Sequence, residues 1–347
     1  MLHTMPPGNP KILAVATATP AHYFPQPQVA LLAGYEDAQR RGFFANSGIE
    51  GRYLYLDPAR VRTDESAEEL NDRFQRGALE CGSAAARACL ERAGWQPRDL
   101  DFLATTTCTG RLCPSLDAHL IRDLGCRPDI QRVHVGDTGC ASALVALQQA
   151  SNHLRAFPGH RALVVAVEIC SAAYYLDDRL ESAVAHAIFA DGAGALALGT
   201  EGEGANLVEH QTLFRSEHLD AMGFRYPGGR PQVILSKEVR KIGGVMMKEM
   251  ATSLLASQGL KKEDVAFWIL HSAGRRVIEN VQELLDLSAD DVAASRAVLG
   301  RYGNMSSATV IFVFEEALRR AQPVPGDWGV MIALGPGFAA EGALLRW

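Results

Sequence analysis

Residues 136–150, GDTGCASALVALQQA, decide the fold once they are compared with residues 302–318, YGNMSSATVIFVFEEAL. In each stretch a polar turn containing glycine runs directly into an apolar helix. Cys140 and Asn304 hold matching places in the two stretches, although they are far apart in the chain. A match at such a long period is typical of a chain built from two copies of one unit.

Two further pairs of segments repeat at almost the same separation. Residues 91–107, ERAGWQPRDLDFLATTT, and 256–272, ASQGLKKEDVAFWILHS, each close a helix with glycine, pass through polar residues to an acid and enter a buried strand. Their acids, Asp99 and Asp264, are separated almost as Cys140 and Asn304 are, and so are the strand-like runs 162–169 and 329–336. Because all three pairs fall in the same order, we predict a duplicated protein. Chance recurrence of patterns common to α/β proteins is the alternative.

Short apolar runs along the chain predict buried strands, because they are aliphatic or β-branched on both faces. Between them lie helical stretches, the clearest at 66–93, where Ser66 and Glu69 form a capping box and Gly94 ends the helix. This alternation predicts an α/β layered fold, with one half at residues 1–205 and the other at 206–347. The predicted strands are KILAVATATP (11–20), DLDFLATTT (99–107), RALVVAVEI (161–169), AIFADGAGALALG (187–199), DVAFWILHS (264–272), WGVMIALGPG (328–337) and GALLRW (342–347).

Composition excludes several classes of protein. The net charge is -6 with no block of Lys and Arg, which argues against a nucleic-acid partner. No apolar run approaches the roughly 18 residues that span a bilayer. We interpret residues 1–10 as a short disordered lead-in rather than a secretory signal, so we expect a cytoplasmic protein. The seven cysteines are odd in number and include no CxxC pair, so we expect neither a disulfide framework nor a metal site.

Three polar residues lie where the duplication brings strand and helix ends together. Cys140 precedes a helix, whose positive end favours a thiolate. His271 ends a buried strand and could polarise a thiolate or an oxyanion. Asn304 precedes the matching helix and could donate a hydrogen bond to an oxyanion. Taken singly, each has a simpler interpretation, respectively a core cysteine, a structural histidine and a helix cap.

Together these residues carry a family resemblance. The segments that carry it are GCASAL (139–144), HSAGRRVIENV (271–281), RAVLGRYGNMSSATVIFVFEE (296–316) and ALGPGF (333–338). From about residue 11 to its end the chain resembles the type III polyketide synthases, the chalcone-synthase-like branch of the thiolase-fold condensing enzymes. The resemblance implies a thiolase-like layered αβαβα fold made of two halves.

The resemblance also implies an acyltransferase mechanism. Cys140 would be acylated by an acyl-CoA starter, while His271 and Asn304 would hold malonyl-CoA and stabilise the enolate formed as carbon dioxide leaves. Repeated extension and cyclisation would give a phenolic or pyrone product. The substrates would be CoA thioesters, and neither a metal nor a redox cofactor would be needed.

Further site residues follow from the resemblance alone. Phe189 matches a gatekeeper at the mouth of the cavity, Val233 stands where a second gatekeeper phenylalanine is usual, and Cys113 matches a residue that crosses a homodimer interface. The alternative for Phe189 is a core aromatic on a strand, and for Cys108 and Cys170 it is that both are simply buried small residues. The residues matching the cavity lining are Cys108, Cys170, Ser306, Gly335, Pro336 and Gly337.

The binding of CoA phosphates is less regular in this chain. The family's basic positions are occupied by Gln39, Gly42 and Asn46, so Arg40 and Arg41 are the candidate phosphate ligands, unless they simply form a solvated helix face. Delivery of one substrate by an acyl carrier protein is the alternative. Two rival functions stay open, a ketoacyl synthase III-like enzyme that makes one condensation on a carrier-bound chain and a non-catalytic partner subunit.

Overall fold

The computed structural model describes residues 8–58, 65–173 and 179–347. Most of the predicted N-terminal lead-in, residues 1–7, lies outside the described residues. The main sheet has nine strands in the order β11-β12-β13-β8-β1-β7-β6-β4-β5. Its strands are β1 (Lys11–Ala18), β4 (Phe102–Thr107), β5 (Gln131–Gly136), β6 (Ala162–Ile169), β7 (Asp191–Gly199), β8 (Ala205–Phe214), β11 (Val265–Leu270), β12 (Trp328–Gly335) and β13 (Ala339–Arg346).

The strand order repeats, as the duplication predicts. In the first half, β1, β7 and β6 pair antiparallel and β6 pairs parallel with β4; in the second, β8, β13 and β12 pair antiparallel and β12 pairs parallel with β11. The two halves join where Lys11 and Ile12 of β1 pair with β8. The boundary between residues 205 and 206 stays a prediction.

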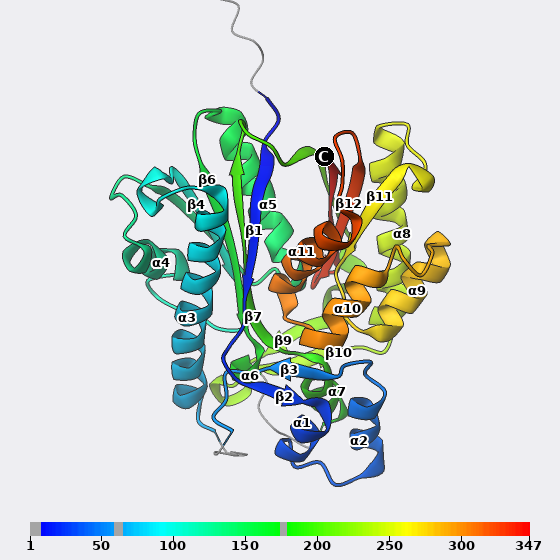
Figure 1. The fold of residues 1–347 in the computed structure, drawn as a ribbon. Helices are drawn as coiled ribbons and strands as arrows, with labels where there is room; N and C mark the ends of the chain where they lie inside the picture. Colours follow the sequence, from blue (N-terminus) through cyan, green and yellow to red (C-terminus); the bar gives the residue numbers. More distant parts are fainter. Residues whose placement is uncertain (1–7, 59–64, 174–178) are drawn as a thin grey trace, which may run out of the picture.

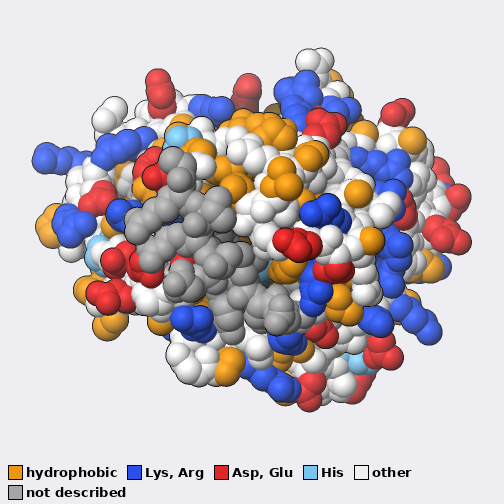
Figure 2. All heavy atoms as spheres, turned by 90° about the horizontal axis from the view of Figure 1, so that it is seen from below, with side chains coloured by type: hydrophobic (Ala, Val, Ile, Leu, Met, Phe, Trp, Pro, Cys, Tyr) orange, Lys and Arg blue, Asp and Glu red, His pale blue; other side chains and the backbone are white. Residues whose placement is uncertain are grey.

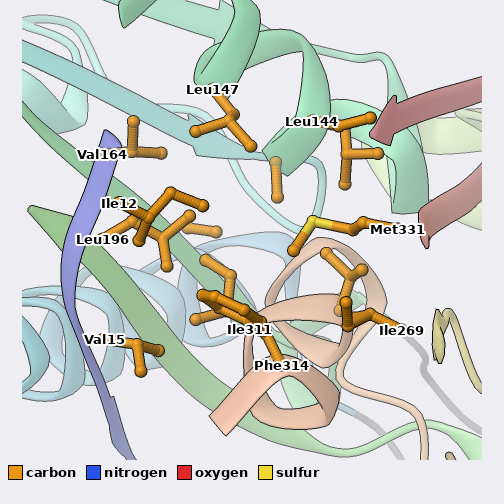
Figure 3. Close-up of a cluster of buried hydrophobic side chains, with 14 of the residues drawn as sticks. Ile12, Val15, Leu144, Leu147, Val164, Leu196, Ile269, Ile311, Phe314 and Met331 are labelled. Atoms are coloured by element: carbon orange, nitrogen blue, oxygen red, sulfur yellow. The ribbon is translucent and has the colours of Figure 1, made fainter. Parts of the chain in front are cut away.

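Two buried helices fill the centre of the molecule. Helices α5 (Ser142–Ala156) and α11 (Thr309–Ala321) bury most of their circumference, so neither has a broad solvent-facing stripe. Figure 3 shows Leu144 and Leu147 of α5 with Ile311 and Phe314 of α11 among side chains from the strands of both halves. This apolar layer is the core shared by the two halves.

Outer helices cover the sheet on its other faces, which gives the alternating layers of Figure 1. Helix α3 (Ala67–Ala93) packs on β1, β6 and β7, and helix α8 (Val239–Ser257) packs on β8, β12 and β13. The predicted capping box of α3 is confirmed, with Ser66 and Glu69 satisfying each other's backbone N–H and a left-handed Gly94 ending the helix. The αβαβα fold class is therefore confirmed.

The expected strands are found, although several of them begin or end at other residues than expected. The run 187–199 does not begin as a strand, because its first residues end helix α7 and β7 starts at Asp191. β5 and β8 were not expected, since their half-exposed, polar patterns lack the apolar run used to recognise strands. The remaining elements are α1 (Gln26–Leu32), α2 (Ala38–Ala45), α4 (Leu116–Leu124), α6 (Cys170–Ala173), α7 (Leu180–Ile188), α9 (Arg275–Leu285), α10 (Ala293–Tyr302), β2 (Tyr23–Pro25), β3 (Gly51–Tyr53), β9 (Met222–Arg225) and β10 (Gln232–Leu235).

Three further observations concern the cysteines, the helices and the surface charge. All seven cysteines are free thiols. Among the described residues, no helix combines the length and apolar character needed to cross a membrane. On the face drawn in Figure 2, basic and acidic side chains are interspersed rather than gathered into one field.

Candidate active site

Cys140 lies in a tight turn at the start of a central helix. The turn, η2 (Gly139–Ala141), leads directly into α5, and the Cys140 side chain is buried. Gly139 has φ +60°, and a Cβ placed there would lie 2.2 Å from Cδ of Pro336. A Cβ on Gly335 would likewise approach the carbonyl oxygen of Thr138 to 2.6 Å. The loop of residues 335–337 therefore rests on the turn that carries the thiol.

Ser306 links Cys140 to the opposite half of the molecule. Its hydroxyl oxygen lies 3.3 Å from Sγ of Cys140 and 3.1 Å from Sγ of Cys108. Ser306 opens the turn η6 (Ser306–Ala308) and has φ +49°, an uncommon value for a residue with a side chain. The packing of both halves thus holds one hydroxyl between two thiols.

Asn304 has its amide orientation fixed by neighbours. Its Oδ1 accepts hydrogen bonds from the backbone N–H of Ser306 (2.8 Å) and from the hydroxyl of Thr309 (3.3 Å). Its Nδ2 donates to the carbonyl oxygen of Ala273 at 3.2 Å. Because an amide nitrogen carries two hydrogens, one donor is left for a ligand. Asn304 contacts Thr309 at the start of α11, as a helix cap would, and its second Nδ2 hydrogen is a donor for a ligand.

His271 is buried at the end of β11 beside these groups. Its backbone N–H donates to Ile332 of β12, and its carbonyl oxygen accepts from the N–H of Ala273, whose own carbonyl binds Asn304. Neither ring nitrogen has a hydrogen-bond partner among the described residues. A buried polar group without a partner is unusual, so the ring is available for chemistry.

Burial keeps both the thiol and the imidazole neutral. It raises the pKa of Cys140 to about 12, against a smaller lowering effect of the Ser306 hydroxyl. It lowers the pKa of His271 to about 4. The sequence led us to expect a thiolate favoured by the helix end, but in this enclosed site desolvation outweighs the dipole. Near neutral pH the Cys140 thiol therefore keeps its proton and the His271 imidazole carries no charge.

Glu168 was missed in the sequence, although it interrupts the apolar run 162–169. Its fully buried carboxylate accepts hydrogen bonds from the Thr109 hydroxyl (2.8 Å), the Cys108 N–H (3.1 Å) and the Ser307 hydroxyl. Burial raises the pKa of this carboxyl group despite those donors. Glu168 thus ties the Cys108 segment to the turn that carries Ser306, and a lone charge in a buried strand was the signal for it.

Phe189 lies beside Asn304. The two residues form an isolated parallel bridge, in which Asn304 N donates to the carbonyl oxygen of Ile188 and Ala190 N donates to the carbonyl oxygen of Asn304, both at 2.8 Å. One short stretch of backbone pairing therefore fixes the positions of both Phe189, the gatekeeper candidate, and Asn304.

The other predicted site residues are more scattered. Cys170 is buried where β6 meets α6, and burial raises its pKa well above the usual value. Val233 is buried on β10. Cys113 is exposed. Arg40 pairs with Asp37, and Arg41 donates to the carbonyl oxygen of Tyr35, so both candidate phosphate ligands have partners within the chain.

Comparison with known proteins shows which family has this fold and sequence. Residues 43–269 match the family described as FAE1/Type III polyketide synthase-like protein, and residues 232–347 match the chalcone and stilbene synthase C-terminal domain. A 3,5-dihydroxyphenylacetyl-CoA synthase of Streptomyces toyocaensis is 35% identical, over 98% of this chain and 91% of that protein. A 1,3,6,8-tetrahydroxynaphthalene synthase of Streptomyces peucetius subsp. caesius is 31% identical, over 99% and 93%. The crystal structure of PKS-I from the brown alga Ectocarpus siliculosus superposes with a TM-score of 0.90 at 30% identity, covering 98% of both chains.

The duplicated layers and the cysteine turn define a condensing enzyme of the thiolase fold. Relatives above 30% identity extend over nearly the whole chain, and a matching family covers well over half of it. The chain belongs to the type III polyketide synthase family. It is an acyl-transferring enzyme, and neither a single-condensation carrier-dependent synthase nor a non-catalytic subunit is favoured.

Proposed function

We propose that Cys140 is the nucleophile of this polyketide synthase and that His271 and Asn304 hold the thioester carbonyl of malonyl-CoA. The observation that carries the proposal is a continuous path of contacts. Sγ of Cys140 contacts the hydroxyl of Ser306, and the Ser306 N–H donates to Oδ1 of Asn304. Nδ2 of Asn304 in turn donates to the carbonyl oxygen of Ala273, in the loop that starts at His271. The path supports convergence of the three residues on one site.

Loading of the starter follows from the neutral thiol and imidazole. As the Cys140 sulfur attacks the acyl-CoA carbonyl, its proton passes to a ring nitrogen of His271. The sulfur–carbon bond to CoA then breaks, and the CoA thiolate leaves with that proton. His271 can take this part because its pKa is lowered to about 4, which leaves it unprotonated near neutral pH.

Extension uses the free donor of Asn304. The malonyl carboxylate leaves as carbon dioxide, and the electron pair of the broken C–C bond forms an enolate. The enolate oxygen accepts hydrogen bonds from Nδ2 of Asn304 and from His271, donors that act best where water is excluded. The enolate carbon then attacks the acyl-Cys140 carbonyl, and the sulfur leaves and recovers a proton. This scheme needs no metal or redox cofactor.

Iteration and cyclisation complete the proposed function, with a phenolic or pyrone product. The names of the Streptomyces relatives point to phenolic products. The proposal includes CoA thioester substrates, a homodimer with Cys113 at the interface, and a cytoplasmic location. Phe189, Val233, Cys108, Cys170 and Ser306 line the cavity in this scheme, and Arg40 and Arg41 exchange their present partners for CoA phosphates.

The test is product formation by the purified enzyme. Malonyl-CoA is supplied alone and with a panel of acyl-CoA starters, and products are identified by mass spectrometry, with 3,5-dihydroxyphenylacetyl-CoA sought first. Chains extended more than once support the proposal. A single extension, or turnover only with malonyl-acyl carrier protein, would instead support the ketoacyl synthase alternative.

A further inference from the structure

Arg52, on the short strand β3, is the largest of the almost fully buried side chains among the described residues, with 1% of its surface exposed. Its Nη1 donates to the carbonyl oxygen of Phe189 at 2.6 Å, while Nε and Nη2 have no hydrogen-bond partner in the described part of the chain. Burial lowers the pKa of Arg52 to about 9, an effect countered by Asp191 and Cys170, so the guanidinium stays charged near neutral pH. Burying a charge this incompletely paired is costly, and it calls for a functional reason.

Arg52 and Asn304 form hydrogen bonds with the same peptide unit. The Phe189 carbonyl and the Ala190 N–H belong to one peptide unit, and that N–H donates to the carbonyl oxygen of Asn304 at 2.8 Å. A peptide unit is planar and rigid. Arg52 and Asn304 therefore bind opposite edges of the same plane, and a rotation that breaks one contact disturbs the other.

The stem of Arg52 also packs on the residue before Asn304. A Cβ on Gly303 would lie 2.7 Å from Cδ and 2.9 Å from Cγ of Arg52, and Gly303 has φ +72°. Only glycine allows this close approach without displacing the arginine. Arg52 thus contacts both strands of the Phe189–Asn304 bridge, one through its charged end and the other through its aliphatic stem.

We propose that Arg52 is a positioning residue for condensation, which fixes the Phe189–Ala190 peptide and through it the amide of Asn304 and the ring of Phe189. The inference rests on the proposed role of Asn304 in holding the malonyl thioester. A charged donor suits the task because it binds a carbonyl oxygen more strongly than a neutral one. Within the described residues no hydrogen bond joins Arg52 to Cys140, so loading of the thiol should depend on this arginine far less than decarboxylation does.

The experiment measures the two half-reactions separately in Arg52→Met and Arg52→Lys. Acyl loading of Cys140 is followed by intact-protein mass spectrometry, and decarboxylation by carbon dioxide release from malonyl-CoA. Arg127→Met is the matched control, because Arg127 is a partly buried arginine whose partners, Asp101 and Asp129, lie outside the site. Thermal unfolding of each variant shows that it is folded.

We expect Arg52→Met to slow decarboxylation about 10- to 100-fold, the effect of losing one charge-assisted hydrogen bond, and to change loading less than about threefold. Arg52→Lys, which keeps one charged donor, should recover decarboxylation to within about tenfold of the wild type. Arg127→Met should leave the ratio of the two half-reactions unchanged.

Equal losses of loading and decarboxylation in Arg52→Met would assign Arg52 a purely structural part and overturn the inference. If Arg52→Met does not fold, Arg52→Gln takes its place, and equal losses of loading and decarboxylation in that variant overturn the inference. A wild-type enzyme that releases no carbon dioxide from malonyl-CoA would instead remove the proposed function itself.

Discussion

Replacing Gly139 by alanine should disturb the thiol turn in a way that can be worked out from the structure. The added Cβ would lie 2.2 Å from Cδ and 2.8 Å from Cγ of Pro336, and the backbone has φ +60°. A proline ring cannot rotate away as a flexible side chain would. Either the loop of residues 335–337 or the turn before α5 has to move.

The expected loss of stability has two parts. Holding alanine in the left-handed region costs about 1–2 kcal/mol, and forcing a methyl group into a filled space costs about 1–3 kcal/mol. Gly94→Ala is the matched control, because Gly94 has φ +69° and nothing within 4 Å of its added Cβ. That variant should lose only the backbone part.

Both variants are unfolded with denaturant and compared with the wild type. We expect a loss of about 2–5 kcal/mol for Gly139→Ala and about 1–2 kcal/mol for Gly94→Ala. We also expect slower acylation of Cys140 in the first variant only, because the displaced turn carries the thiol. The reasoning fails if the two variants lose the same stability and load acyl groups equally well.

Four further predictions concern the site. Cys140→Ala should abolish chain extension with the fold intact, and extension at the wild-type rate in a product assay would contradict the nucleophile. Asn304→Ala should impair malonyl decarboxylation more than acyl loading, as followed by carbon dioxide release and mass spectrometry, whereas equal losses would count against its role. Burial lowers the pKa of His271 from 6.5 to about 4, so between these pH values the folded state binds fewer protons than the unfolded chain. The free energy of unfolding should therefore fall by about 3 kcal/mol as the pH drops through that window. His271→Asn should lack this part of the pH dependence in denaturant titrations. Glu168→Leu should cost at least about 1–3 kcal/mol in the same titrations, since the donors it satisfies would be left buried without an acceptor.

The sequence predicted the elements whose side-chain pattern is set by burial. The strand run at 162–169 and the capped helix after Ser66 depend on local residues, and both are found. Duplication and strand ends indicated where the chain converges, and this led us to Cys140, His271 and Asn304 as candidates. What the sequence could not supply is side-chain contact across the halves, such as the Ser306 hydroxyl between two thiols. The pKa directions were missed for the same reason, because they depend on how completely the fold excludes water from Cys140.

The structure pairs the residues of the two halves at a slightly different sequence separation from the one that the motifs indicated. The turns η2 and η6 begin at Gly139 and Ser306, and helices α5 and α11 begin at Ser142 and Thr309, so both pairs of elements have the same separation along the chain. That separation is slightly longer than the one between Cys140 and Asn304. Cys140 therefore corresponds to Ser307 rather than to Asn304, and Gly139 corresponds to Ser306; the latter two both have positive φ.

The ends of β6 and β12 follow the same register. Glu168 of β6 and Gly335 of β12 occupy equivalent places, and each packs against the turn of the opposite half. Glu168 contacts Ser307 of η6, and Gly335 contacts Ala141 of η2. At one turn the strand end brings a carboxylate that binds a hydroxyl, and at the other it brings a glycine, whose lack of a side chain lets the strand end approach Thr138 and Ala141 closely. Under the proposed function, the two copies of this turn differ in their task, because one carries the nucleophile and the other gives it a rigid support.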